Sequence, residues 1–329
     1  MKIHILYNFQ KSPWGGGNQF LKALRKEFEK QDVYEQNPEK ADVILFNSHH
    51  NFNKVFNFKK KFKNKIFIHR IDGPVYLIRG TNKDLDKIIF RFNNLIADGI
   101  IFQSNWCQEK NKKSFEILAK YEIVIHNAPD KEIFNKDNKK TFNPDKIKLV
   151  SASWSPNWRK GYEVYKYLDE NLDFSKYEMC FAGNSPVEFK NIKNLKPVCS
   201  EELAKLLKEY DIYITASQND PCSNSLIEAL SSGLPVLALN SGGHPELLQK
   251  GGELFEGKQD IIEKIEKVAK NYSYYQSQIP EFSIQGVAQD YYEFAQGISD
   301  SKKIGFLTKL NFYKLKLMVL KREIKNKLC

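Results

Sequence analysis

Short apolar runs alternate with segments of helical periodicity through the first part of the chain. Residues 15–30 open on glycines and then repeat apolar side chains at three- and four-residue steps, which predicts an amphipathic helix. Its apolar face comprises Phe20, Leu21, Leu24 and Phe28. Five apolar runs predict buried strands at 2–8, 41–48, 65–71, 98–104 and 122–128. Buried strands separated by helices are typical of a parallel sheet, so this part predicts an α/β domain.

The apolar pattern stops at residues 135–146, which are polar, rich in Asn and interrupted by Pro144. This composition is typical of a linker. The alternation then restarts and predicts four strands of a second α/β domain, at 147–153, 177–184, 211–217 and 234–240. We therefore expect one domain in residues 1–143 and another in residues 144–281.

The C-terminal part has a different pattern. Residues 302–329 hold nine Lys or Arg side chains against one acid, Glu323, and their apolar residues recur at helical spacing. A basic amphipathic helix can lie on an anionic membrane surface. The alternative, which the sequence leaves open, is a helix packed on its own protein.

Length and charge narrow the class of protein. The chain has 329 residues, and single cores stop growing near about 250–300 residues, which agrees with two domains. The net charge of +11 favours an anionic partner, although solvated surface Lys alone also produces such a charge. Outside residues 302–329 the excess of Lys is diffuse, so we do not expect nucleic-acid binding.

The cysteines and the N-terminus bear on location. No two of the five cysteines form a Cys-x-x-Cys pair, and their spacing predicts neither a zinc site nor a disulfide framework. Free thiols fit a reducing compartment. "MKIHILYNF" lacks the features of a signal peptide, and no stretch of 18 apolar residues is present. The expected location is the cytoplasm, and membrane binding by residues 302–329 would place the protein on the inner face of the membrane.

The densest cluster of candidate chemistry follows the predicted strand at 211–217. Pro221 delays the next helix. We expect Ser223 or Asn224 to cap this helix, which should run to about Ser232 before Gly233 stops it. The start of this helix then points out of the carboxyl end of a parallel strand. Free N–H groups and the helix dipole at such a place favour phosphate.

Two carboxylates flank this helix start. Glu228, one turn into the helix, can accept hydrogen bonds from a vicinal diol such as a ribose, and Asp220 lies in the loop before the helix. Acids on both sides of an anion site suit a nucleotide sugar, with the ribose at one end and the hexose at the other. The alternative for Glu228 alone is that it complements the helix dipole.

Two more loops belong to the same edge of the predicted sheet. Arg159 and Lys160 follow the strand at 147–153, where two cations can neutralise a diphosphate leaving group; ordinary surface charge is the alternative. Gly242 and Gly243 follow the next predicted strand and allow a ligand to approach the backbone closely.

The first domain offers weaker signals. Three glycines precede its first helix, but they match only part of a dinucleotide-binding pattern, because Phe20 occupies the third glycine position. His69 lies near the end of the predicted strand at 65–71, and Asp72 directly follows this strand. A lone His at such a place is more often structural than catalytic.

The ordered set of motifs resembles glycosyltransferase family 4. It comprises "NWRKG" after a strand, "FAGN", "ASQNDPCSNSLIEALSSGLPVLALNSGGHPEL" and the N-terminal glycine loop. Members of that family are retaining, nucleotide-sugar-dependent enzymes of the GT-B fold. The resemblance implies two Rossmann-like domains facing a cleft, with acceptor binding in the first and donor binding in the second. It also implies a last helix at 282–297 that crosses back to the first domain, followed by the basic amphipathic tail at 298–329.

The resemblance assigns roles to individual residues. The family has two glutamates with seven residues between them, and these positions hold Asp220 and Glu228 here. It implies that Glu228 contacts the ribose and that Asp220 contacts hydroxyls of the transferred sugar. Lys160 matches the diphosphate-binding lysine, but the usual arginine is replaced by Trp154, which makes Arg159 the candidate for the missing charge.

The remaining expected contacts fall into two groups. The donor-binding group consists of residues at helix starts and in glycine loops: Ser223, Asn224, Ser225, Gly16, Gly17, Gly242 and Gly243. On the acceptor side, the resemblance places His69 and Asp72 near the sugar as catalytic candidates.

The expected function is a retaining sugar transfer from a nucleoside-diphosphate sugar to a glycan or lipid-linked acceptor, in the synthesis of a bacterial-type surface polysaccharide. We expect no cofactor and no metal, because no Asp-x-Asp motif lies at a suitable strand end. Two alternatives stay open: a nucleotide-sugar epimerase on the same fold, and a non-catalytic protein that binds sugar nucleotides or glycans.

Overall fold

The computed structural model describes residues 1–10, 15–301 and 317. It divides into two compact units. The first comprises Met1–Phe9, Leu24–Ile125 and the chain from Gln285, and the second comprises Gln10–Ala23 and His126–Ile284. The basic tail expected at 302–329 lies outside the described residues, apart from one position. No helix in the described ranges is long and apolar enough to cross a membrane.

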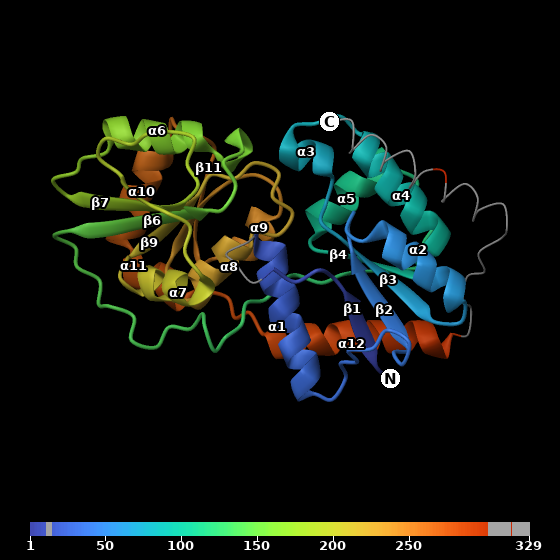
Figure 1. Ribbon diagram of the computed structural model, residues 1–329. Coiled ribbons are helices and arrows are strands. Elements are labelled where there is room, and N and C mark those ends of the chain that lie inside the picture. The colour runs from blue at the N-terminus through green and yellow to red at the C-terminus, as the bar shows by residue number, and fades with distance from the viewer. Residues whose placement is uncertain (11–14, 302–316, 318–329) are drawn as a thin grey trace. The chain divides into compact units, whose positions relative to one another are not determined.

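The first unit is built on a five-stranded parallel sheet in the order β1-β2-β3-β4-β5 (Figure 1). Its strands are β1 (Ile3–Leu6), β2 (Val43–Asn47), β3 (Ile66–Ile71), β4 (Gly99–Phe102) and β5 (Tyr121–Val124). Every residue of β2, β3 and β4 is buried, as expected for a sheet covered on both faces. A parallel bridge joins Tyr34 to Ile3 on the edge of β1 that does not bond to β2, so the direction of winding reverses at β1.

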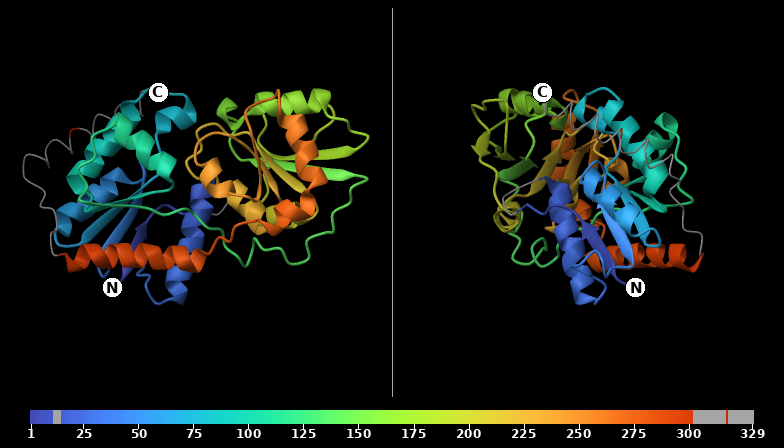
Figure 2. Two further views of the ribbon diagram at one scale, coloured as in Figure 1. Left: turned by 180° about the vertical axis from the view of Figure 1, so that it is seen from behind. Right: turned by 45° about the vertical axis from the view of Figure 1, so that its right-hand side comes forward.

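Helices cover both faces of this sheet. α2 (Phe52–Lys61), α4 (Asp84–Ile96) and α5 (Asn105–Ser114) lie on one face, and α12 (Ile284–Asp300) runs across the other (Figures 1 and 2). The short helix α3 (Val75–Arg79) follows β3. The side chains of α12 that are buried within the unit are Ala288, Tyr291, Ala295 and Ile298. Gly99 makes room for this helix, because a Cβ there would come within 2.5 Å of the Ile298 side chain.

The second unit is built on a six-stranded parallel sheet in the order β11-β10-β9-β6-β7-β8. Its strands are β6 (Ile147–Ser153), β7 (Tyr177–Gly183), β8 (Lys193–Leu195), β9 (Ile212–Thr215), β10 (Val236–Leu239) and β11 (Gly252–Phe255). The chain passes from β6 to β7 and β8 on one side and then returns to β9 on the other side of β6. This strand order is that of a Rossmann-type sheet, in which ligands bind outside the carboxyl ends of the two strands where the order reverses.

The second unit has a core on each face of its sheet. α6 (Tyr162–Asn171) and α10 (Ile261–Lys270) lie on one face, and α7 (Ser200–Lys208) and α8 (Asn224–Ser231) lie on the other (Figure 1). Successive residues of β6 point to opposite faces. Leu149 accordingly packs in the first core and Val150 in the second. The remaining short helices are η1 (Trp158–Lys160), α9 (His244–Leu248) and α11 (Tyr272–Ser277).

The predicted fold class, two parallel-sheet α/β domains, is confirmed. The apolar face predicted for α1 (Gly16–Lys30) is also confirmed, because all four of its predicted side chains are buried. Differences are local. β8 and β11 were missed, the strand predicted at 122–128 ends at Val124, and α12 continues to Asp300.

A buried ion pair stabilises the first unit away from the carboxyl edge of its sheet. Lys59 Nζ lies 3.0 Å from Asp98 Oδ2, and both side chains are only 2% exposed. The backbone N–H of Phe67 donates to the same carboxylate oxygen. Burial lowers the pKa of Lys59, and the nearby Asp98 carboxylate opposes this shift. Each charge therefore depends on the other for its compensation.

Replacing Asp98 by Ala should lower the free energy of unfolding of the first unit by about 3–5 kcal/mol, because it leaves the Lys59 ammonium buried without its partner. Urea denaturation measures the change. Glu39→Ala is the matched control: it removes the partner of Lys61 in an ion pair whose side chains are 58% and 53% exposed, and should cost at most about 1 kcal/mol. Equal losses in the two variants would contradict the prediction.

Candidate functional site

The loops after β6 and β9 frame the place where the strand order of the second unit reverses. Gly161 ends the β6 loop with φ +84°, and a Cβ there would lie 2.3 Å from the Cβ of Ala216 in the β9 loop. Glycine is therefore required for this close approach. The backbone N–H of Gln218 donates to the carbonyl of Arg159 at 2.7 Å. These contacts bring Lys160 beside the β9 loop.

Lys160 and Asp220 form an ion pair across this gap. Lys160 Nζ lies 3.0 Å from Asp220 Oδ2, with the side chains 27% and 14% exposed. Burial alone would raise the pKa of Asp220, but Lys160 and His244 outweigh it and hold the pKa below its ordinary value. Asp220 is therefore ionised at neutral pH and already engaged with a cation.

The glycine loop after β10 contacts the backbone of Asp220. The N–H of Gly243 donates to the Asp220 carbonyl at 2.8 Å. Gly242 has φ +68°, and a Cβ there would lie 2.2 Å from the same carbonyl oxygen. These glycines were predicted to contact the donor; what the structure places against them is the backbone of the loop that carries Asp220.

His244 is a buried neighbour of the pair. Its Nδ1–H donates to the carbonyl of Leu239 at 2.8 Å, and its Nε2 has no hydrogen-bond partner among the described residues. Burial lowers the pKa of His244, although the Asp220 carboxylate opposes the shift. The ring is therefore neutral at pH 7, with Nε2 as a free acceptor.

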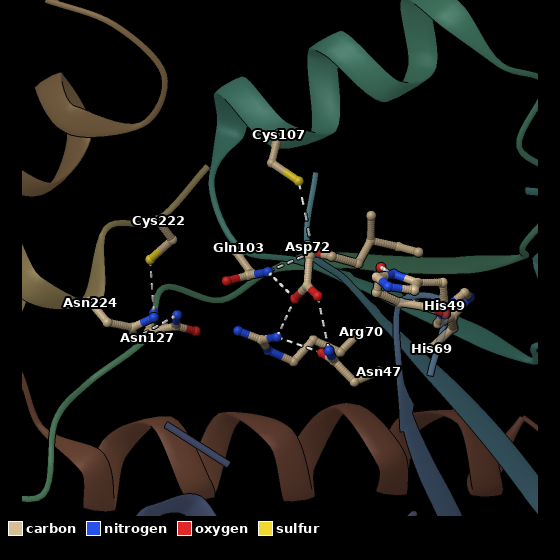
Figure 3. A network of polar contacts seen from close by, with 12 residues as sticks. Asn47, His49, His69, Arg70, Asp72, Gln103, Cys107, Asn127, Cys222 and Asn224 are labelled. Atoms are coloured by element: carbon tan, nitrogen blue, oxygen red, sulfur yellow. Dashed lines mark hydrogen bonds and ion pairs between the residues drawn. The ribbon is translucent and has the colours of Figure 1, made fainter. Parts of the chain in front are cut away.

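Helix α8 begins beside Asp220, as the sequence predicted. Ser223 precedes its first residue, and the Ser223 hydroxyl lies 3.3 Å from that of Ser225 without bonding to the helix backbone. Asn224 Oδ1 accepts from Asn127 Nδ2 at 3.1 Å (Figure 3). The backbone N–H groups of the first turn therefore receive no cap from the Ser223 side chain, and an anionic ligand can bind them.

Glu228, one turn into α8, is a buried carboxyl. The residue is 8% exposed, and no hydrogen bond or ion pair joins its carboxyl group to another described residue. Burial raises the pKa of Glu228 from 4.5 to about 8. A neutral carboxyl at pH 7 can both donate and accept hydrogen bonds, so a ligand that carries hydroxyls would satisfy it.

These groups line one pocket of about 220 Å³ in the second unit. Lys160, Asp220 and Glu228 contribute to its wall, together with Ser223, Asn224 and Ser225. Gly16 lines the same pocket, and a Cβ at Gly16 would lie within 2.6 Å of the Asn224 side chain. Gly17, Gly242 and Gly243 are not among the lining residues in the part of the chain that the structure describes.

The described residues give the pocket little positive charge. Lys160 is the one Lys or Arg among its described lining residues. Arg159 points elsewhere, because its Nη1 donates to Gln218 Oε1 at 3.3 Å, so the structure does not bring this predicted phosphate ligand into the pocket. Trp154, at the position of the family's arginine, does line it. Within residues 1–10 and 15–301, no three His, Cys, Asp or Glu side chains are placed to hold a metal ion.

The first unit carries a separate polar cluster near the carboxyl ends of β2, β3 and β4 (Figure 3). The fully buried Arg70 donates through Nη1 to Asn47 Oδ1 and Asp72 Oδ1, at 2.6 and 2.8 Å. Asn47 Nδ2 and Gln103 Nε2 also donate to the Asp72 carboxylate, each at 2.9 Å. Burial alone would raise the pKa of Asp72, but Arg70 outweighs it and the pKa is lowered. Asp72, 32% exposed, is therefore a fixed, ionised hydrogen-bond acceptor.

His69 lies in the core of the first unit. Its Nε2–H donates to the carbonyl of Ser48 at 2.8 Å, its Nδ1 accepts from Asn93 at 3.0 Å, and its ring stacks on Phe46. Burial lowers its pKa to about 4. Both ring nitrogens are occupied and the residue is 0% exposed, so the placement favours the structural role over the catalytic one.

Two histidines that were not expected from the sequence lie next to Asp72. His49 and His50 follow β2 and stack with ring centroids 4.5 Å apart. Both are among the charges that lower the pKa of Asp72, and the ring of Tyr7 meets His50 edge to face at 5.3 Å. The polar "SHHN" directly after a predicted strand was the available signal.

Replacing Glu228 by Gln should remove a pH dependence of stability. Between about pH 4.5 and pH 8 the folded chain keeps a proton on Glu228 that the unfolded chain loses. Stability therefore falls as the pH rises through this window, with a slope of up to about 1.4 kcal/mol per pH unit. Gln does not titrate, so the melting temperature of the variant minus that of the wild type should increase from about pH 5 to pH 8.5.

Thermal unfolding of the ligand-free chain across this pH range measures the difference. Glu163→Gln, at an exposed carboxyl on α6, is the matched control and should give a difference that does not change with pH. A constant difference for Glu228→Gln would contradict the assignment.

Two comparisons concern sequence. Residues 135–281 match the family model of glycosyl transferases group 1. The chain is 25% identical, over 219 residues, to the phosphatidylinositol N-acetylglucosaminyltransferase GPI3 subunit of Saccharomyces cerevisiae (strain YJM789). This match covers 56% of the chain and 48% of the relative, so the chain spans about half the length of the curated relative that it matches.

Solved structures align with a larger share of the chain. HepE of Anabaena, in complex with UDP and glucose, aligns with a TM-score of 0.70 at 15% identity, over 90% of this chain and 100% of HepE. Sucrose-phosphate synthase of Thermosynechococcus elongatus aligns with a TM-score of 0.65 at 12% identity, over 99% of this chain and 100% of that one. At such identities the likeness shows the fold alone. The chain therefore has the GT-B fold of glycosyltransferases, and its residues 135–281 match the glycosyl transferases group 1 family.

Proposed function

We propose that this chain transfers a sugar from a nucleoside-diphosphate sugar to a glycan or lipid-linked acceptor, with retention at the anomeric carbon, in the synthesis of a bacterial-type surface polysaccharide. One observation carries the proposal: a pocket at the reversal point of a Rossmann-type sheet holds the Lys160–Asp220 ion pair and the buried Glu228, whose carboxyl has no partner among the described residues. HepE, which has the same fold, was solved with UDP and glucose, and this supports a nucleotide-sugar donor.

Each part of the donor meets a different group in this proposal. Glu228 binds the ribose hydroxyls, because its carboxyl is buried in the pocket wall without another partner. Lys160 and the uncapped N–H groups of α8 offset the charge of the diphosphate. Asp220 accepts hydrogen bonds from hydroxyls of the transferred sugar. Binding therefore exchanges the Lys160–Asp220 contact for two contacts with the donor.

The chemical step breaks the bond between the anomeric carbon and the diphosphate oxygen. Negative charge then grows on the leaving oxygen, where Lys160 and the α8 N–H groups stabilise it. The acceptor hydroxyl attacks from the same face and passes its proton to the departing phosphate. No protein nucleophile and no divalent cation take part in this scheme.

In this proposal the acceptor is bound by residues of the first unit. Asp72, ionised and held by Arg70, Asn47 and Gln103, is proposed to accept a hydrogen bond from the acceptor. We also propose that residues 302–329 bind an anionic membrane surface, from their basic amphipathic sequence. This would hold the protein at the cytoplasmic face of a membrane that carries a lipid-linked acceptor.

Titration calorimetry with UDP, GDP and ADP, followed by turnover assays with the corresponding sugar donors, tests the function. We expect one nucleotide class to bind, its sugar donor to be consumed, and activity to persist in EDTA. NMR of the product should show the donor's anomeric configuration. Conversion of the donor into another sugar nucleotide without an acceptor would indicate an epimerase, and binding without turnover would indicate a binding protein. Absence of nucleotide binding would refute the proposal.

Substitutions at Lys160 and Asp220 should have different effects on nucleotide binding. Lys160→Met removes the cation and should weaken nucleoside-diphosphate binding by about 10- to 100-fold, since a charged hydrogen bond contributes about 1.5–3 kcal/mol. Asp220→Asn frees Lys160 and removes a negative charge, so it should leave that affinity unchanged or raise it.

The same Asp220→Asn variant should lower turnover by about tenfold or more, because the sugar loses a charged contact that aligns it. Calorimetry and steady-state kinetics on both variants separate the two effects. Equal loss of nucleotide binding in Lys160→Met and Asp220→Asn would contradict the proposed roles.

A further inference from the structure

The pocket of the second unit has two chemically different ends. One end is polar and carries Lys160, Asp220 and Glu228, which come from the β6 loop, the β9 loop and α8. The other end is uncharged, and its lining includes Trp154, Gly183, Pro197, Val198 and Leu203. Because β6 lies between β9 and β7 in the sheet, the two ends follow one another along its carboxyl edge.

At Gly183 the uncharged end is lined by backbone alone. Gly183 closes β7 with φ +144°, and a Cβ there would lie 1.8 Å from the Ser153 carbonyl oxygen, so no side chain projects from this position. Pro197 and Val198 lie in the connection between β8 and α7. None of these lining residues, nor Trp154, carries a charge.

The backbone at Trp154 is held in place, and the residue is 40% exposed. Asn184 Nδ2 donates to the Trp154 carbonyl at 2.7 Å. The neighbouring Ser155 carbonyl accepts from the hydroxyls of Ser153 and Tyr162, at 3.1 and 2.7 Å. The backbone on both sides of the Trp154 peptide is thus fixed by hydrogen bonds, and Trp154 lines the pocket whose other end is polar.

We propose that Trp154 stacks on the base of the donor nucleotide and thereby contributes donor affinity. The inference rests on the proposed function and specifies how its donor is recognised. An indole cannot neutralise a diphosphate, but it stacks on the π-face of any nucleobase. The base is the flat, weakly polar part of a nucleotide sugar, and it matches the uncharged end of the pocket.

The proposal fixes the direction in which the donor lies. The sugar and diphosphate occupy the β9 side, where Lys160, Asp220 and the start of α8 provide charge and N–H groups. The base occupies the β7–β8 side against Trp154. Affinity that a second cation would supply through phosphate comes instead from stacking, so it depends on the presence of a base and only weakly on ionic strength.

The test compares Trp154→Ala, Trp154→Phe and the matched control Trp158→Ala. Trp158 lies in the same loop, is 55% exposed and is not among the lining residues that the structure describes. We expect Trp154→Ala to weaken UDP, GDP or ADP binding by about tenfold or more, whereas inorganic pyrophosphate binding changes less than about twofold. Trp154→Phe should keep most of the affinity, and Trp158→Ala should bind as the wild type does.

Fluorescence provides a second readout. Binding of the nucleoside diphosphate should quench indole emission in the wild type and in Trp158→Phe, and this quenching should disappear in Trp154→Phe. Melting temperatures identify any variant that does not fold.

Three outcomes overturn the inference. Equal nucleotide affinity in the wild type and Trp154→Ala excludes stacking and leaves the proposed function intact. A loss seen only with the sugar donor, and not with the free nucleoside diphosphate, places the ring against the sugar. Absence of nucleotide binding in the wild type refutes the proposed function itself.

Discussion

Parallel pairing is the constraint on which the rest of this chain depends. Because each strand must run in the same direction as its neighbour, the chain returns through a helix after nearly every strand, and all the loops that follow strands gather at one edge. In the second unit the strand order reverses between β6 and β9. The two loops there cannot be covered by a crossover helix. They pack against each other through Gly161 and Ala216, and the space beside them is the pocket.

Within that pocket the charges are balanced before any ligand arrives. Lys160 is paired with Asp220, and burial keeps Glu228 neutral at pH 7. A pocket prepared in this way avoids the repulsion of two ionised acids and keeps a cation close to the start of α8. The cost is that a phosphate must compete with Asp220 for Lys160. Selectivity then comes from a ligand that also offers hydroxyls to the released carboxylate.

Part of this arrangement could be predicted from local sequence. Pro221 and Gly233 restrict the backbone strongly, and α8 falls within one residue of its predicted bounds. Lys160 and Asp220 could be assigned to one sheet edge because each follows a predicted strand. Their contact could not, since it depends on β6 and β9 being neighbours across about sixty residues. The same holds for His69, whose burial is decided by Ser48, Asn93 and Phe46. The missed strands β8 and β11 are three and four residues long and carry few apolar side chains.

The first unit is built from separate segments of the chain, and this affects the order in which the units fold during synthesis. α12 covers one face of the first sheet, although it lies more than 150 residues beyond β5 in the sequence. Gly99 has no side chain that would collide with this helix. During synthesis on the ribosome, strands β1 to β5 emerge first but lack this helix until the second unit has been translated. At about 5–20 residues per second the sheet would wait on the order of ten seconds or more with an apolar face open to solvent. The second unit, whose two cores lie within one continuous stretch from His126, can complete its folding earlier. We therefore expect the N-terminal unit to be the later of the two to reach its native state.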